Sequence, residues 1–272
     1  MVGQLISVNA GPVFNGNGLP PITQDAVDMA AAQMPSLEHY MDPEKLKAKG
    51  EISRSKGDGR LITFTSTSAM TIGTVAGKYN GRNVLKSPGN TLGLDIGPGG
   101  LAVSPSFTFV IACDLAAAMR SGTTDGYLLA AYNPTVAGFM QVVRFFGNAG
   151  KGLLFTARSS GGGGSASLDL ASVPAADTPF VLAVSYDAAT TQIRAYINTT
   201  TAAIASADAN VAPTPDKLTK LQIGYPIGNP ATAWVGNIGK VLAFSRSFHK
   251  TAVDLALLEN LMISMRTHYG II

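Results

Sequence analysis

From residue 61 to residue 248, apolar and polar residues alternate with a period of two in short runs. The runs are rich in β-branched and aromatic residues, and clusters of Gly, Pro, Asn and Asp separate them. This pattern is typical of short strands joined by turns. No segment between the runs has the length and 3.6-residue period of a crossover helix, so antiparallel pairing is expected. The sequence therefore predicts a mainly β protein built as an antiparallel β-sandwich.

The predicted strands are spaced closely enough to fill one sandwich domain. We expect them at residues 61–66, 83–87, 92–96, 106–115, 127–132, 139–146, 153–158, 180–186, 192–198, 221–224 and 234–245. Residues 161–164 are four consecutive glycines, which we interpret as a mobile hairpin loop. Residues 61–248 thus form the predicted sandwich.

The first 60 residues have a different pattern, with a turn-rich opening followed by two helical signals. We expect one helix over residues 23–34, which ends before Pro35. The second has Asp42 as N-cap, Pro43 at the first helical position and Gly50 just beyond its end. Residues 1–60 are therefore predicted to form an extended and helical anchoring segment.

The last 24 residues, 249–272, are predicted to form a helix that packs on the sandwich. Thr251 and Asp254 make a capping pattern at its start. Apolar residues then recur at helical spacing, namely Val253, Leu257, Leu258, Leu261 and Met265.

The composition narrows the function classes. Only 14% of the residues are charged, compared with about 25% in typical proteins, and 46% are hydrophobic. Such a chain suits a subunit packed among neighbours. The net charge of +3 comes from scattered Lys and Arg, which argues against nucleic-acid binding. We expect no membrane span, since no run approaches the ~18 apolar residues required, and no secretion signal.

The single cysteine, Cys113, cannot form an internal disulfide. It ends the apolar run at residues 109–113, so we expect a buried strand thiol.

Three segments of the chain resemble a known family. Residues 179–187 with 192–198 resemble a strand hairpin of the laminin G-like and pentraxin-like branch of the concanavalin A-like lectin/glucanase superfamily. Residues 221–224 with 234–248 are similar to that family's closing strands, and residues 104–110 to an early strand. The resemblance implies a jelly-roll sandwich. Gly239 stands where the family usually has Asp, so no Asp-dependent cation site is carried over.

Catalytic chemistry finds little support in the sequence. Glycoside hydrolysis needs two carboxyl groups about 5–9 Å apart, and no Glu lies between residues 52 and 258. The three histidines, His39, His249 and His268, lie outside the predicted strands. We therefore predict no catalytic residue, no metal site and no cofactor.

Sugar binding usually relies on exposed aromatic faces flanked by amides. Tyr225, Asn229 and Trp234 fall around one predicted loop and are the candidate ligand-binding residues. Trp234 begins a strand where the family places a core aromatic, so we favour a core role for it.

A lectin-like sandwich without a secretion signal suits a virion component, because phage particles assemble in the host cytoplasm and leave by lysis. By this analogy we predict a non-enzymatic phage virion protein, head decoration or tail-associated. It would form a homo-oligomer, with sister subunits and other virion proteins as partners and residues 1–60 as the anchor. The alternatives are a carbohydrate-binding receptor adhesin that recognises a host surface glycan, and, third, a glycan-cleaving enzyme.

Overall fold

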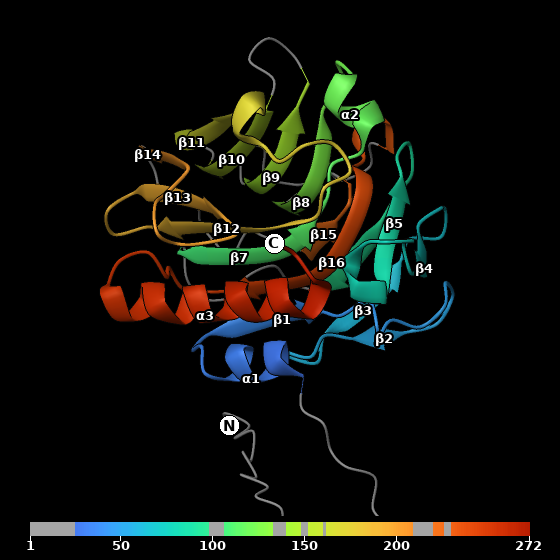
Figure 1. The fold of residues 1–272 in the computed structure, drawn as a ribbon, viewed down its shortest axis with the longest axis horizontal. Coiled ribbons are helices and arrows are strands. Elements are labelled where there is room, and N and C mark those ends of the chain that lie inside the picture. The colour runs from blue at the N-terminus through green and yellow to red at the C-terminus, as the bar shows by residue number, and fades with distance from the viewer. Residues whose placement is uncertain are drawn as a thin grey trace, which may run out of the picture.

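The protein is a two-layer antiparallel β-sandwich in a computed structural model (Figure 1). The structure describes residues 25–97, 106–132, 140–147, 152–159, 162–208, 220–225 and 230–272. Within these residues each sheet has eight strands, and all strand ladders are antiparallel. The predicted class, mainly β with antiparallel sheets and a C-terminal helix, is confirmed.

Sheet A carries the long central strands. Its order along the hydrogen bonds is β14 (Ala205–Asp208), β13 (Gln192–Ile197), β12 (Phe180–Asp187), β7 (Phe107–Cys113), β16 (Val235–Phe244), β5 (Val84–Pro88) and β4 (Thr71–Gly73). One further strand, β1 (Leu37–Met41), pairs with the later part of β16.

Sheet B faces sheet A across the core. Its order is β11 (Gly162–Asp169), β10 (Gly152–Ser159), β9 (Met140–Phe146), β8 (Gly126–Tyr132), β15 (Lys220–Ile223), β6 (Leu94–Gly97), β3 (Leu61–Phe64) and β2 (Ser53–Arg54). Each predicted strand overlaps one of the observed strands.

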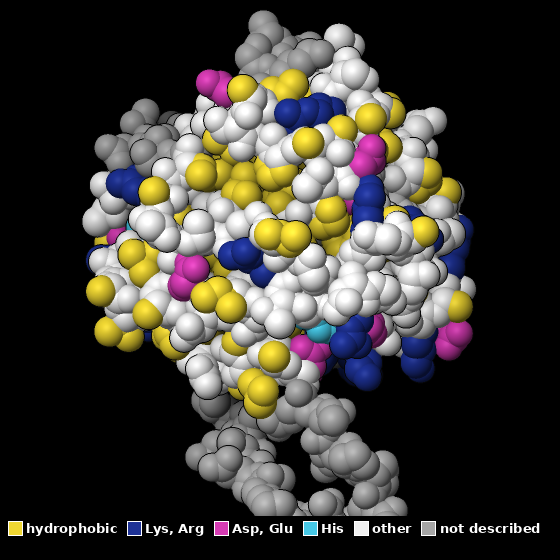
Figure 2. All heavy atoms as spheres, viewed as in Figure 1, with side chains coloured by type: hydrophobic (Ala, Val, Ile, Leu, Met, Phe, Trp, Pro, Cys, Tyr) yellow, Lys and Arg dark blue, Asp and Glu magenta, His cyan; other side chains and the backbone are white. Residues whose placement is uncertain are grey.

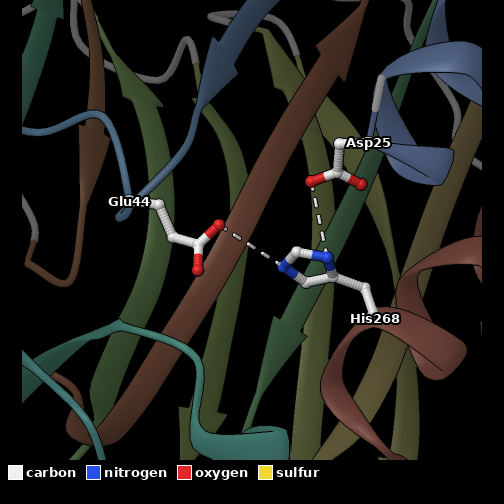
Figure 3. A group of neighbouring side chains, drawn as sticks. All are labelled: Asp25, Glu44 and His268. Atoms are coloured by element: carbon white, nitrogen blue, oxygen red, sulfur yellow. Dashed lines mark ion pairs between the residues drawn. The ribbon is translucent and has the colours of Figure 1, made fainter. Parts of the chain in front are cut away.

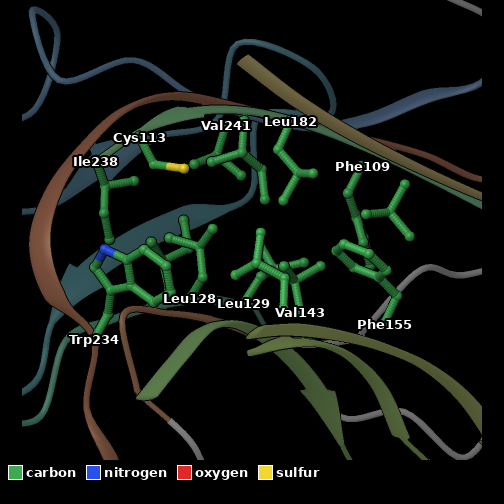
Figure 4. Packing of buried hydrophobic residues seen from close by; sticks show 14 of the residues in the cluster. Phe109, Cys113, Leu128, Leu129, Val143, Phe155, Leu182, Trp234, Ile238 and Val241 are labelled. Atoms are coloured by element: carbon green, nitrogen blue, oxygen red, sulfur yellow. The ribbon is translucent and has the colours of Figure 1, made fainter. Parts of the chain in front are cut away.

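The alternation of side chains places the core between the sheets. In β12, Phe180, Leu182 and Val184 point into this core, while Val181 and Ala183 face the opposite side of the sheet. Figure 4 shows side chains of both sheets meeting in this core, with the indole of Trp234 at one end and the rings of Phe109 and Phe155 at the other. Fully burying one such large apolar side chain contributes about 1.5–3 kcal/mol.

Cys113 belongs to this core and is completely buried, as expected. Burial raises the pKa of its thiol well above the ordinary value. The thiol is therefore protonated and unreactive at neutral pH.

The prediction of a glycine hairpin loop is wrong for the glycines that the structure describes. Residues 162–164 lie inside β11 and pair with residues 157–159 of β10. Glycine backbones can make ladder bonds like any others, and Ala166 and Leu168 fix the register by pointing into the core. Gly161 lies outside the described residues.

Part of the N-terminal segment behaves differently from the prediction. Helix α1 (Ala26–Ala32) forms inside the first predicted helix. The second predicted helix is absent, and residues 43–45 form a turn. One carboxylate oxygen of Asp42 accepts a hydrogen bond from the N–H of Glu44 at 3.0 Å, as a helix cap would. Its other oxygen binds the ammonium groups of Lys56 and Lys240. These tertiary contacts override the local helix signal.

The described residues before position 60 also extend both sheets, through β1 and β2. Strand β1 contains Glu38 and His39, so the expectation that all histidines lie outside strands is wrong for His39. Residues 25–60 therefore pack within the sandwich. Whether they also anchor the chain to a particle stays a prediction.

The C-terminal helix α3 (Ala252–Tyr269) starts at Thr251, whose hydroxyl accepts the N–H of Asp254 at 3.1 Å. It ends at Gly270, which has a φ of 62°. Helices α1 and α3 lie side by side on the outer face of sheet A (Figure 1), where Leu258 and Met262 join a second apolar cluster. Within the described chain, no helix is long and apolar enough to cross a membrane.

The other helical pieces within the described ranges are short. They are α2 (Ala117–Ser121) and the 3-10 turns η2 (Tyr79–Gly81), η3 (Leu170–Ser172) and η5 (Pro230–Thr232). On the face shown in Figure 2, charged side chains lie scattered between neutral and apolar ones, in keeping with the low charged fraction.

Candidate ligand-binding surface

The aromatic residues predicted to bind a ligand do not face the solvent. Tyr225 is 2% exposed and Trp234 is fully buried. The Tyr225 hydroxyl donates to Asp95, and burial raises its pKa. Trp234 donates its indole N–H to the carbonyl of Asp114 at 3.0 Å. The favoured core role of Trp234 fits this position, and neither ring presents a face for stacking on a sugar. Asn229 lies outside the described residues.

A different set of side chains projects from the outer face of sheet B. Arg144 on β9 lies opposite Tyr127 on β8 and Leu154 on β10, and Leu154 lies opposite Ser167 on β11. Directly opposite residues share a face of the sheet. All four are half-buried or exposed, whereas the intervening Val143 and Phe145 are buried in the core.

Arg144 is the centre of this surface. Its Nη1 donates to the Asp125 carboxylate at 2.9 Å and to the Tyr127 hydroxyl at 2.7 Å. Its guanidinium carbon lies 5.3 Å from the ring centre of Tyr127 and 5.3 Å from that of Phe146. The Arg144 side chain remains 23% exposed. We call Asp125, Tyr127, Arg144 and Phe146 the Arg144 surface.

The backbone around this surface explains why the guanidinium is held in place. The second oxygen of Asp125 accepts the N–H of Gly147 at 3.1 Å, which ties the start of β8 to the end of β9. A side chain at Gly147 would collide with the backbone of Thr123. Between Tyr127 and Leu129 the register of β8 shifts, so Leu128 and Leu129 both enter the core while Tyr127 stays outside.

The surface offers two kinds of contact to a ligand. Among the described residues, Nε and Nη2 of Arg144 have no hydrogen-bond partner, and this edge of a guanidinium matches a carboxylate bidentately. The two flanking rings offer apolar area at little entropic cost. Sequence reasoning missed the surface because its members meet only through the β8–β9 register.

A second polar cluster lies on the opposite side of the molecule, between sheet A and helices α1 and α3. Lys240 of β16 is fully buried. Its ammonium binds Asp25, the Asp42 carboxylate at 3.2 Å and the Tyr40 hydroxyl at 3.1 Å. Although burial raises it, the hydrogen bond from Lys240 lowers the pKa of Asp25 below its ordinary value. The ammonium of Lys240 thus lies where a metal cation would have to bind these carboxylates.

His268 of α3 borders this cluster (Figure 3). Its Nδ1 lies 3.4 Å from Asp25 Oδ2, and its Nε2 lies 4.0 Å from Glu44 Oε2. The two ring nitrogens point to different carboxylates, so the imidazole bridges them. Donor atoms of these three residues lie within 4.8 Å of one another, but they do not converge on one point, which argues for an ion-pair bridge and not a metal centre. The predicted lack of a metal site stays a prediction.

The structure also brings a serine to a histidine, which the sequence did not indicate. Ser185 of β12 lies 2.9 Å from Nδ1 of His249. Ser185 is fully buried, and its hydroxyl accepts the N–H of Phe248 at 3.0 Å and contacts Thr108 at 2.9 Å. Such a hydroxyl cannot reach a substrate. The pair connects the turn before α3 to sheet A.

Comparisons with known proteins support the fold. No protein-family model and no curated protein matches the chain. Domain 4 of AbnA, an extracellular GH43 arabinanase from Geobacillus stearothermophilus solved in complex with arabinotriose, is similar with a TM-score of 0.53 and 13% identity. The match covers 84% of this chain and 98% of that domain.

A Trypanosoma rangeli sialidase in complex with sialic acid is similar with a TM-score of 0.54 and 12% identity, over 86% of this chain. This chain spans 33% of the sialidase. The Ruminococcus gnavus sialidase module CBM40, bound to α2,3-sialyllactose, has a TM-score of 0.45 and 14% identity, over 58% of this chain and 83% of the module. At these identities the matches to AbnA domain 4 and to the T. rangeli sialidase show a similar β-sandwich fold.

Proposed function

We propose that this protein is a non-catalytic module that binds a glycan on the Arg144 surface. The observation that carries the proposal is the Arg144 guanidinium, whose side chain is 23% exposed, held by Asp125 at 5.3 Å from the centres of two aromatic rings. A cation fixed beside apolar rings recognises a sugar that carries a carboxylate, since the rings cover the sugar's C–H groups and the guanidinium pairs with the acid. An acidic glycan is therefore the ligand class.

The fold comparisons support carbohydrate binding in general, and they bear neither on the charge of the ligand nor on the residues that bind it. One neighbour was solved with arabinotriose and another with sialic acid. These ligands belong to those proteins, and their fold supports glycan binding here by analogy alone.

The non-catalytic part of the proposal rests on the carboxylates near the surface. Asp125 makes hydrogen bonds to Arg144 and Gly147 and so is committed to positioning. All four glutamates of the chain, Glu38, Glu44, Glu51 and Glu259, lie outside sheet B. A hydrolase of the two-carboxylate type would need a second acid beside Asp125.

A glycan array tests the proposal. The wild-type protein should bind glycans with uronic or sialic acid residues, and Arg144→Gln should lose that binding by about tenfold or more, the value of a charge-assisted hydrogen bond. Arg54→Gln, on an exposed arginine of the same sheet, is the matched control and should bind normally. Equal binding by wild type and Arg144→Gln would refute the site. New reducing ends after incubation would revive the glycan-cleaving alternative.

We propose as a second candidate a structural role in a phage virion, with the sandwich displayed outward. The low charged fraction and the scattered charges support it. Because residues 25–60 complete the sheets, the test of anchoring is deletion of residues 1–24 only. Light scattering should show a homo-oligomer of the full chain, and incorporation into particles should fall on deletion. A monomeric full chain would count against this role.

A further inference from the structure

A groove of about 270 Å³ opens on the other sheet, at the edge formed by β4, β5 and β16. This volume is slightly below the usual range of about 300–1,000 Å³ for small-molecule sites, so it suits a single ring. The walls combine small apolar and polar residues, among them Thr71, Lys86, Pro88, Val235, Gly236 and Asn237.

Three polar residues lie in one row across this edge. Lys86 on β5 lies opposite Thr71 on β4 and opposite Asn237 on β16. Opposite residues of neighbouring strands project from the same face, so the three side chains line the groove together. The groove wall therefore includes a lysine, a threonine and an asparagine from three neighbouring strands.

The amide of Asn237 is held by a buried acid. Its Nδ2 donates to one oxygen of Asp114 at 2.8 Å, and its backbone N–H donates to the other at 2.8 Å. Asp114 is fully buried. Gly236 allows this approach with a φ of 147°, because a side chain there would collide with the Asp114 carbonyl. Because Nδ2 of Asn237 donates its hydrogen bond to Asp114, Oδ1 of the same amide is the atom that can accept a hydrogen bond from a ligand hydroxyl.

Lys86 differs from the lysines that serve the fold. Lys240 and Lys56 each bind two or more carboxylates. Lys86 has no hydrogen-bond or ion-pair partner in the part of the chain that the structure describes. Its ammonium lies above Gly73, which has no side chain to displace it. A half-buried cation that makes no ion pair with the described residues is available to an anionic ligand.

We infer that the groove at β4, β5 and β16 binds an anionic molecule the size of one sugar ring. Lys86 pairs with the anionic group, Asn237 and Thr71 hydrogen-bond the ligand hydroxyls, and Val235 with Pro88 contacts the ring. This site is separate from the Arg144 surface, so either site can fail without the other.

The test is an NMR titration of the full-length, ¹⁵N-labelled protein with glucuronate, glucose and inorganic phosphate. Glucuronate should shift the amide signals of Gly73 and Gly236 saturably, and glucose should bind about tenfold more weakly because it lacks the charge. Lys86→Met should weaken glucuronate binding by a similar factor, and Lys86→Arg should restore most of it. Lys45→Met, on an exposed lysine, is the control.

Three results would overturn the inference, and a fourth would overturn its assignment of the ligand as a sugar. One is the absence of any saturable shift at these amides with glucuronate. Another is equal glucuronate affinity of wild type and Lys86→Met, and a third is equal affinity for glucose and glucuronate. Phosphate binding as tightly as glucuronate would remove the part of the inference that concerns the sugar ring. In all four cases the Arg144→Gln glycan-array result remains an independent test of the proposed function.

Discussion

The two outer faces of the sandwich use strand cations in opposite ways. On sheet A, helices α1 and α3 cover Lys240, whose ammonium is surrounded by aspartates and fully buried. On sheet B, the Arg144 side chain stays 23% exposed, and one of its nitrogens donates a hydrogen bond to a single aspartate, Asp125. In the first arrangement all the contacts of the cation are with groups of the protein, which hold β16 to the start of α1. The second fixes the cation while leaving an edge of it accessible, which is what a binding site requires.

The largest effect should come from removing the buried cation. Lys240→Met leaves Asp25 and Asp42 without their main counter-charge inside the protein. Breaking a buried ion pair in this way costs about 3–5 kcal/mol. Urea unfolding should show this loss in the free energy of unfolding, while Lys45→Met on the surface should change it by less than about 0.5 kcal/mol. A Lys240→Met protein as stable as wild type would show that the covered face does not depend on this charge.

An intermediate effect should follow from pH, through His249, which contacts Ser185 of sheet A, and His268, which lies beside Asp25 and Glu44. Burial and the nearby Arg194 lower the pKa of His249 to about 4, and burial and Lys240 lower the pKa of His268. In the unfolded chain both histidines have a pKa of about 6.5, so below this pH the unfolded chain binds protons that the folded chain does not bind. Stability should therefore be highest above about pH 6.5 and fall by about 1–3 kcal/mol as the pH drops toward 4.

The measurement for this prediction is the free energy of unfolding at several pH values between 7.5 and 4.5. The His249→Asn, His268→Asn double variant should show a flatter curve, whatever its stability at neutral pH. The carboxylates with lowered pKa, such as Asp42, affect stability only at lower pH. An equally steep curve in the double variant would assign the effect to other groups.

The smallest effect on stability is expected on the open face. Arg144→Gln breaks a partly exposed ion pair, for which about 0–1 kcal/mol is typical. Thermal unfolding should place this variant close to wild type even though its glycan binding is lost. A drop comparable to that of Lys240→Met would mean that Arg144 holds the fold together and would remove the contrast between the faces.

Local patterns predicted most strands because burial on one side of a strand leaves a period of two in the sequence. They missed β1, whose residues Glu38 and His39 look like loop residues, since its partner β16 lies about 200 residues away in the chain. They also predicted a helix after Asp42, where the chain forms a turn and the Asp42 carboxylate binds Lys56 and Lys240. Short-range signals do not contain such contacts.

The candidate site was less accessible to sequence reasoning than the fold. Tyr225 and Trp234 attracted attention as aromatic residues near a loop, and both are buried. Arg144 was visible only as one charged residue within a strand. Its role depends on Asp125 and Tyr127, which the strand register and a bulge bring to it. A site of this kind is a property of the sheet and leaves no motif.

The position of β16 has a consequence for biosynthesis. This strand pairs with β1, β5 and β7, which are all made earlier, and it begins only at residue 235 of 272. Until β16 has been synthesised, the backbone groups of β1, β5 and β7 that pair with it have no partner strand. Open edges invite pairing with other chains, and such long-range closure is slow. We expect sheet A to close only after β16 has been synthesised, so truncated chains that end before residue 235 should aggregate.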